Sequence, residues 1–113
     1  MARPTNDVLG GTLDLLILKA LSWGPAHGYA VARWIEQETN DALAVGEGTL
    51  YPALHRLEER GWVTASWGTS ENNRRAKFYD LTGAGQARLR DESKNWRRYA
   101  EAVFAALESR ARP

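Results

Sequence analysis

The chain has 113 residues, of which 15 are basic and 14 acidic, so its formal net charge is +1. This length fits one domain, and a hydrophobic content of 43% supports a packed core rather than disorder. The absence of cysteine excludes disulfide bonds and thiolate metal sites. The charge excludes a nucleic-acid binder that relies on bulk positive charge alone. No apolar run approaches the roughly 20 residues that span a bilayer, and the first residues lack the apolar centre of a signal peptide. We therefore expect a cytoplasmic protein.

Two helices are predicted in the first third of the chain, after a loosely ordered start at residues 1–9. The segment from Leu13 to Trp23 is apolar on most sides, which predicts a largely buried helix that ends at Gly24 and Pro25. A second helix, with one apolar and one polar side, is predicted from His27 to Gln37. Residues 43–45 then favour a very short strand.

A third helix is predicted between Gly46 and Val63. Its apolar residues Leu50, Leu54 and Leu57 have the spacing i, i+4, i+7 and so share one face. We expect Thr49 to cap the start, Pro52 to lie in the first turn and Gly61 to end the helix. The outward side offers hydroxyl, ring and basic groups that suit a DNA major groove, although an ordinary amphipathic surface helix is the alternative.

After Gly61 the apolar period shortens towards two, which predicts a β-hairpin. Residues 62–67 and 75–81 are rich in strand-forming residues, and the polar residues between them form a turn. Thr82 and Gly83 then open a long helix over residues 83–109.

The element order predicts a mainly α fold with a small β-hairpin. Three helices followed by a hairpin define a winged helix-turn-helix, in which the third helix enters the major groove and the hairpin, or wing, reaches the flanking DNA backbone. We assign residues 1–82 to this DNA-binding domain and residues 83–113 to a C-terminal dimerisation helix.

Two motifs in this chain resemble the PadR family of transcriptional regulators. These are Gly48-Thr-Leu-Tyr-Pro-Ala-Leu54 and Arg75-Ala-Lys-Phe-Tyr-Asp-Leu-Thr82, with further similarity in register from about residue 9 to residue 90. The resemblance implies a winged helix whose C-terminal helix builds a homodimer, and usually a repressor. A chain that ends at Pro113 is similar to the family's subgroup with short C-terminal tails.

Seven residues are the candidate DNA-binding residues. Hydroxyl groups near the start of the third helix can bond phosphate oxygens, and Arg56 can bind phosphate or guanine. The alternatives are a Tyr51 ring packed on the wing, an Arg56 pair with Glu59, and a Lys77 pair with Glu58 or Glu59. The candidates are Thr49, Tyr51, His55 and Arg56 on the helix, and Arg74, Arg75 and Lys77 on the wing.

The last helix carries an apolar stripe that a second copy of the chain would cover, because one helix extending from a small domain must bury such a stripe. Packing on its own domain is the alternative. A twofold dimer would bind a palindromic operator with half-sites about one helical turn apart. The resemblance also allows a small aromatic effector that stacks on Trp96 and Tyr99 at that interface, the alternative being an aromatic dimer contact. The stripe comprises Leu89, Trp96, Tyr99, Val103 and Leu107.

No pattern in the sequence supports catalysis, a metal or a cofactor. The chain has only two histidines, and His27 has no partner at ligand spacing, so we interpret it as a hydrogen-bonded residue at a helix start. A winged-helix module that binds protein instead of DNA is the alternative function. The near-neutral charge and the paired acids Glu58 and Glu59 are compatible with it.

Overall fold

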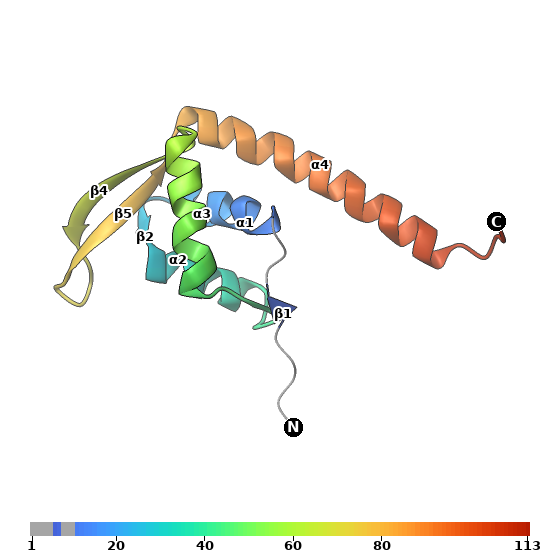
Figure 1. Cartoon of the computed structure of the whole chain (residues 1–113), viewed down its shortest axis with the longest axis horizontal. Coiled ribbons are helices and arrows are strands. Elements are labelled where there is room, and N and C mark those ends of the chain that lie inside the picture. The colour runs from blue at the N-terminus through green and yellow to red at the C-terminus, as the bar shows by residue number, and fades with distance from the viewer. Residues whose placement is uncertain (1–5, 8–10) are drawn as a thin grey trace, which may run out of the picture.

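The computed structural model describes residues 6–7 and 11–113 as helices and short strands around one helical core (Figure 1). The predicted fold class, mainly α with a small antiparallel sheet and a long last helix, is confirmed. The helices are α1 (Thr12–Leu21), α2 (Gly28–Glu38), α3 (Glu47–Glu59) and α4 (Gly83–Glu108); the strands are β1 (Asn6–Asp7), β2 (Ala26–His27), β3 (Leu43–Ala44), β4 (Val63–Thr69) and β5 (Arg75–Leu81).

The core lies where α1 meets α2 and α3. Helix α1 packs against α2, α3 and α4, and its Ile17 and Leu21 are almost fully buried. The predicted leucine face of α3 lies in the same core, with Leu54 and Leu57 at 0% exposure. This packing turns the opposite side of α3 outward, because residues on one helical face cannot also line the other.

The start of α3 differs from the prediction. Gly46, not Thr49, occupies the N-cap position, and the Thr49 hydroxyl donates a hydrogen bond of 3.0 Å to the carbonyl of Gly46. Because the helix begins at Glu47, Pro52 lies in its second turn rather than its first. Glu47 favours the earlier start, since an acidic side chain in the first turn stabilises the positive end of the helix dipole.

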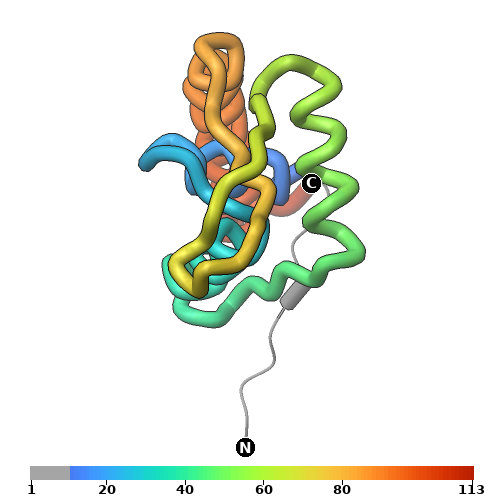
Figure 2. Tube along the Cα trace, turned by 90° about the vertical axis from the view of Figure 1, so that its left-hand side faces the viewer, coloured from blue at the N-terminus to red at the C-terminus, as the bar shows by residue number. Residues whose placement is uncertain are grey.

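The wing is the hairpin of β4 and β5, and it lies beside α3 in both views (Figures 1 and 2). The sheet has a third member that the sequence did not predict: β2 pairs with β5, in the order β2-β5-β4. A two-residue strand such as β2 is too short to show an alternating pattern. It nevertheless ties the connection between α1 and α2 to the wing.

The beginning of the chain also differs from the prediction in one place. We predicted loose order for residues 1–9, and of these the structure describes Asn6 and Asp7. They form β1, which pairs in parallel with the predicted short strand β3. The rest of that prediction lies outside the described residues.

Helix α4 begins at Gly83, directly after its N-cap Thr82, and extends away from the domain (Figure 1). The Thr82 hydroxyl caps it by accepting a 3.0 Å hydrogen bond from the N–H of Gly85. Leu89 packs against the core, whereas most later residues of the helix are exposed. Within the described part of the chain, no helix combines the length and apolar character that crossing a membrane requires.

Candidate nucleic-acid interface

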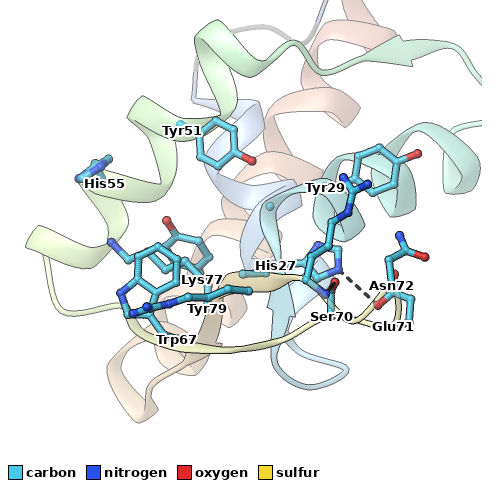
Figure 3. A pocket seen from close by; sticks show the side chains of 14 residues that line it. His27, Tyr29, Tyr51, His55, Trp67, Ser70, Glu71, Asn72, Lys77 and Tyr79 are labelled. Atoms are coloured by element: carbon cyan, nitrogen blue, oxygen red, sulfur yellow. Dashed lines mark hydrogen bonds and ion pairs between the residues drawn. The ribbon is translucent and has the colours of Figure 1, made fainter.

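A groove of about 720 Å³ lies between α3, the start of α2 and one face of the wing (Figure 3). Three separate parts of the chain supply its walls. It brings together five of the seven candidate DNA-binding residues and leaves out Thr49 and Arg56. The lining includes Tyr51 and His55 from α3, His27, Gly28 and Tyr29 from the α2 side, and Trp67, Glu71, Arg74, Arg75 and Lys77 from the hairpin.

The α3 wall consists of Tyr51 and His55, which are one helical turn apart on the side opposite the buried leucines. Tyr51 is 41% exposed, and its ring lies against Gly28 at the start of α2. Gly28 thus adds the start of α2 to the surroundings of this ring, for which the sequence had offered packing on the wing as the alternative. Thr49, two residues before Tyr51, is exposed and is not among the residues that line the groove.

Arg56 is directed towards α1 instead of the groove. Its Nη2 atom lies 2.7 Å from Oδ1 of Asp14, in both a hydrogen bond and an ion pair. The predicted alternative was a pair with Glu59 within α3; the acid is instead Asp14 of a different helix. The guanidinium remains partly exposed, with 46% of the side chain accessible.

The wing wall carries an aromatic and basic face. Trp67 is directly opposite Lys77 in the antiparallel register, and Thr69 is opposite Arg75, so these side chains share one face. The Arg75 guanidinium lies 4.7 Å from the centre of the Trp67 ring. Lys77 pairs with Glu58 at 3.7 Å, which agrees with one of the two predicted pairs.

The tip of the wing is a closed turn that leads into Arg74. The backbone N–H of Ser70 donates a 2.8 Å hydrogen bond to the carbonyl of Arg74, and Asn73 adopts a left-handed φ of 58°. Asparagine tolerates this conformation better than most residues. The turn leaves the Arg74 side chain exposed at the end of the hairpin.

His27 joins the start of α2 to the wing tip. Its Nδ1 atom accepts a 3.2 Å hydrogen bond from the N–H of Ala30, which confirms the interpretation of His27 as a helix-start residue. A neutral ring that accepts at Nδ1 carries its proton on Nε2, and Nε2 lies 3.5 Å from a carboxylate oxygen of Glu71 (Figure 3). A backbone hydrogen bond at Glu71 and then this contact lower the pKa of the Glu71 carboxyl.

Sequence reasoning did not assign several residues that line this site, among them Gly28, Tyr29, Trp67 and Glu71. Trp67 could have been found from the hairpin register, because the residue opposite Lys77 on the neighbouring strand shares its face. Tyr29 and Glu71 join the groove only through packing.

Tyr79 lies on the same wing face as Arg75 and Lys77. Burial, and then the nearby Glu58 and Tyr51, raise the pKa of its hydroxyl group.

The apolar stripe of α4 is mainly exposed. Leu89 packs on its own domain, and Trp96 donates from its indole N–H to the Thr12 hydroxyl at 3.4 Å. Tyr99, Val103 and Leu107 are exposed, as is Phe104, which the predicted stripe omitted. The members beyond Leu89 therefore present an uncovered apolar side.

A second hollow, of about 690 Å³, lies between α1 and α4. Leu15, Leu16 and Trp96 line it, together with the basic residues Lys19, Arg90, Lys94 and Arg97. Tyr99 is not among its lining residues, so the structure does not bring Trp96 and Tyr99 together in one hollow.

Residues 17–91 match the PadR-like family of transcriptional regulators, and the chain belongs to that family. Its members regulate transcription and are not enzymes. The three helices, the hairpin and the long last helix of the structure form the winged-helix fold that the element order predicted.

The chain is similar to protein X of Lysinibacillus sphaericus, at 29% identity over 91% of this chain and 94% of that protein. It is also similar to the negative transcriptional regulator PadR of Bacillus subtilis, at 27% identity over 70% of this chain. The match spans only 43% of the Bacillus protein.

A solved PadR family transcription regulator from Clostridium difficile has the same architecture. The two structures align with a TM-score of 0.74 at 27% identity, covering 86% of this chain and 99% of the other.

Proposed function

We propose that the chain is a sequence-specific DNA-binding repressor that acts as a homodimer on a palindromic operator. The observation that carries this proposal is the groove between α3 and the wing, where Tyr51 and His55 face Arg74 and Arg75 across one space. Helix α3 would enter the major groove and read base edges. The wing would bind the adjacent phosphates.

The charge arrangement supports DNA binding even though the net charge is only +1. Three acids near the proposed interface each have a basic or imidazole partner: Asp14 pairs with Arg56, Glu58 with Lys77, and Glu71 contacts His27. Among the described residues, Arg74 and Arg75 take part in no ion pair. Their charge is therefore available to phosphate oxygens, and local placement compensates for a weak overall field.

The homodimer rests on the exposed stripe of α4. Exposed residues Tyr99, Val103, Phe104 and Leu107 lie on a helix that extends beyond the domain, and a second copy could cover them. A twofold dimer presents two α3 helices to the two halves of a palindrome.

The hollow between α1 and α4 supports a small aromatic effector that stacks on Trp96, with Tyr99 outside it in this structure. Titration with aromatic compounds should quench Trp fluorescence and change operator affinity. No change in either quantity for any compound would argue against an effector.

A gel shift with the DNA upstream of the protein's own gene tests the function. The complex should weaken as salt rises, because each phosphate contact releases counterions. A wild-type chain that shifts no DNA at low salt, but retains a stable protein partner in a pulldown, would instead support the protein-interaction module.

A further inference from the structure

Gly28, the first residue of α2, lies against the ring of Tyr51. A Cβ atom at this position would be 2.9 Å from Cε1, 3.0 Å from the hydroxyl oxygen and 3.1 Å from Cζ of Tyr51. Such distances are too short for ordinary carbon contacts. The Tyr51 ring therefore occupies the space that any other side chain at position 28 would fill.

The backbone of Gly28 does not itself require glycine. Among the described residues, the glycines with positive φ are Gly11, Gly24 and Gly61, so Gly28 has a conformation open to other residues. Glycine is also a poor helix former, and alanine would favour α2. The contact with Tyr51 is thus the structural reason for glycine here.

We infer that Gly28 is a positioning residue for DNA binding, whose bare backbone holds the Tyr51 ring in place and sets its hydroxyl in the groove. This inference rests on the proposed function. A 41% exposed tyrosine would otherwise sample several rotamers. When the Tyr51 side chain is already ordered in the free protein, DNA binding does not have to pay the conformational entropy of ordering it.

The position of the Tyr51 atoms near Gly28 predicts that a substitution at position 28 affects DNA binding without affecting folding. The atoms that a Cβ at position 28 would meet are at the far end of the Tyr51 side chain. The ring can rotate outward without moving either helix. Gly28→Ala should therefore displace the Tyr51 hydroxyl while the domain stays folded.

The test measures the dissociation constant for one duplex, the DNA upstream of the protein's own gene, at low salt. Gly28→Ala should weaken binding roughly tenfold, as expected for a contact worth about one neutral hydrogen bond. Tyr51→Ala should weaken it by a similar factor, and the double variant should bind no worse than Tyr51→Ala alone.

Gly83→Ala is the matched control. Gly83 is likewise the first residue of its helix, after a side-chain N-cap, but a Cβ there has no atom within 4 Å. This variant should bind DNA as the wild type does. The melting temperatures of the two glycine variants should be equal. If Gly28→Ala fails to fold, adding Tyr51→Ala should restore folding.

Three results would overturn the inference. They are wild-type affinity in Gly28→Ala, a further tenfold loss when Gly28→Ala is added to Tyr51→Ala, and a misfolded Gly28→Ala that Tyr51→Ala does not rescue. A wild-type chain that binds no duplex at low salt would overturn the proposed function and this role together. Wild-type binding with an unaffected Gly28→Ala variant overturns the positioning role alone.

Discussion

Arg75 combines a charge with a defined orientation. Its guanidinium lies 4.7 Å from the centre of the Trp67 ring, and stacking of this kind restricts a long flexible side chain. A phosphate contact made by such a group carries no base information. We therefore expect Arg75 to contribute to affinity for every sequence, and Tyr51 and His55 to contribute to the choice of operator.

Arg75→Ala should weaken binding to operator and unrelated DNA by the same factor, and should reduce the salt dependence by about one released counterion per protomer. Equilibrium titrations of both duplexes at several salt concentrations measure this. Arg75→Lys keeps the charge but loses the planar stack, so it should fall between the wild type and the alanine variant. A loss confined to the operator would contradict a backbone role.

Gly85 is a second position where packing requires glycine, but here the neighbour is backbone. An added Cβ would lie 2.1 Å from the carbonyl oxygen of Trp62 and 2.8 Å from a methyl group of Leu81. The Leu81 methyl group can rotate away, but the Trp62 carbonyl is backbone, so the wing and α4 would have to separate.

We expect Gly85→Ala to lower the free energy of unfolding by about 3 kcal/mol, the upper end of typical overpacking costs. Urea unfolding followed by circular dichroism measures it, with Gly83→Ala as the control in the same turn. A Gly85→Ala variant as stable as Gly83→Ala would show that this junction can relax.

At the scale of elements, the wing is held to the start of α2 by two sets of contacts. Strand β2 pairs with β5, and the His27 ring contacts both the Phe78 ring, with centres 5.4 Å apart, and the Glu71 carboxylate at the tip. Because the pKa of Glu71 is lowered in the folded chain, its stabilising effect is present above the ordinary glutamate pKa. It is lost as pH falls through the lowered value.

His27→Asn should raise the pKa of Glu71 towards its ordinary value, but only in part. Asparagine can still cap α2, whereas the contact with the carboxylate disappears. The larger cause, the backbone hydrogen bond at Glu71, remains. A carboxyl NMR titration of both proteins measures the change, with Gln86→Asn as a control away from the wing. An unchanged Glu71 titration would show that His27 does not influence the tip.

At the scale of the whole molecule, α4 sets the shape. The chain measures 59 × 41 × 21 Å, and the long helix extends beyond the domain that holds the groove (Figure 1). Its exposed apolar side cannot reach the domain core. We therefore place the proposed dimer contact on the part of α4 that extends beyond the domain, away from the DNA-binding groove.

Val103→Glu should yield a monomer by light scattering, because a carboxylate in an apolar interface is costly to bury. Operator affinity should fall with it, since one α3 then binds one half-site. Ala105→Glu adds the same charge on the opposite side of α4 and should leave the dimer intact. A dimer that persists in Val103→Glu would place the interface elsewhere.

Local sequence patterns were sufficient to determine most of the fold. The spacing of Leu50, Leu54 and Leu57 fixed the buried side of α3, alternation placed the wing, and the caps at His27 and Thr82 were readable because they act within one helical turn. The candidates on the outward side of α3 followed from the same pattern, since a buried face defines its opposite.

Only the tertiary structure decided which distant residues meet. Four contacts connect separate elements: Arg56 with Asp14, the Tyr51 ring with Gly28, Gly85 with Trp62, and β2 with the wing. Thr49 lies in the first turn of α3, and it is not among the residues that packing brings to the groove. Sequence periodicity assigns a residue to a face of its own element, but the facing partner depends on how the elements pack. That packing is set by the whole core at once.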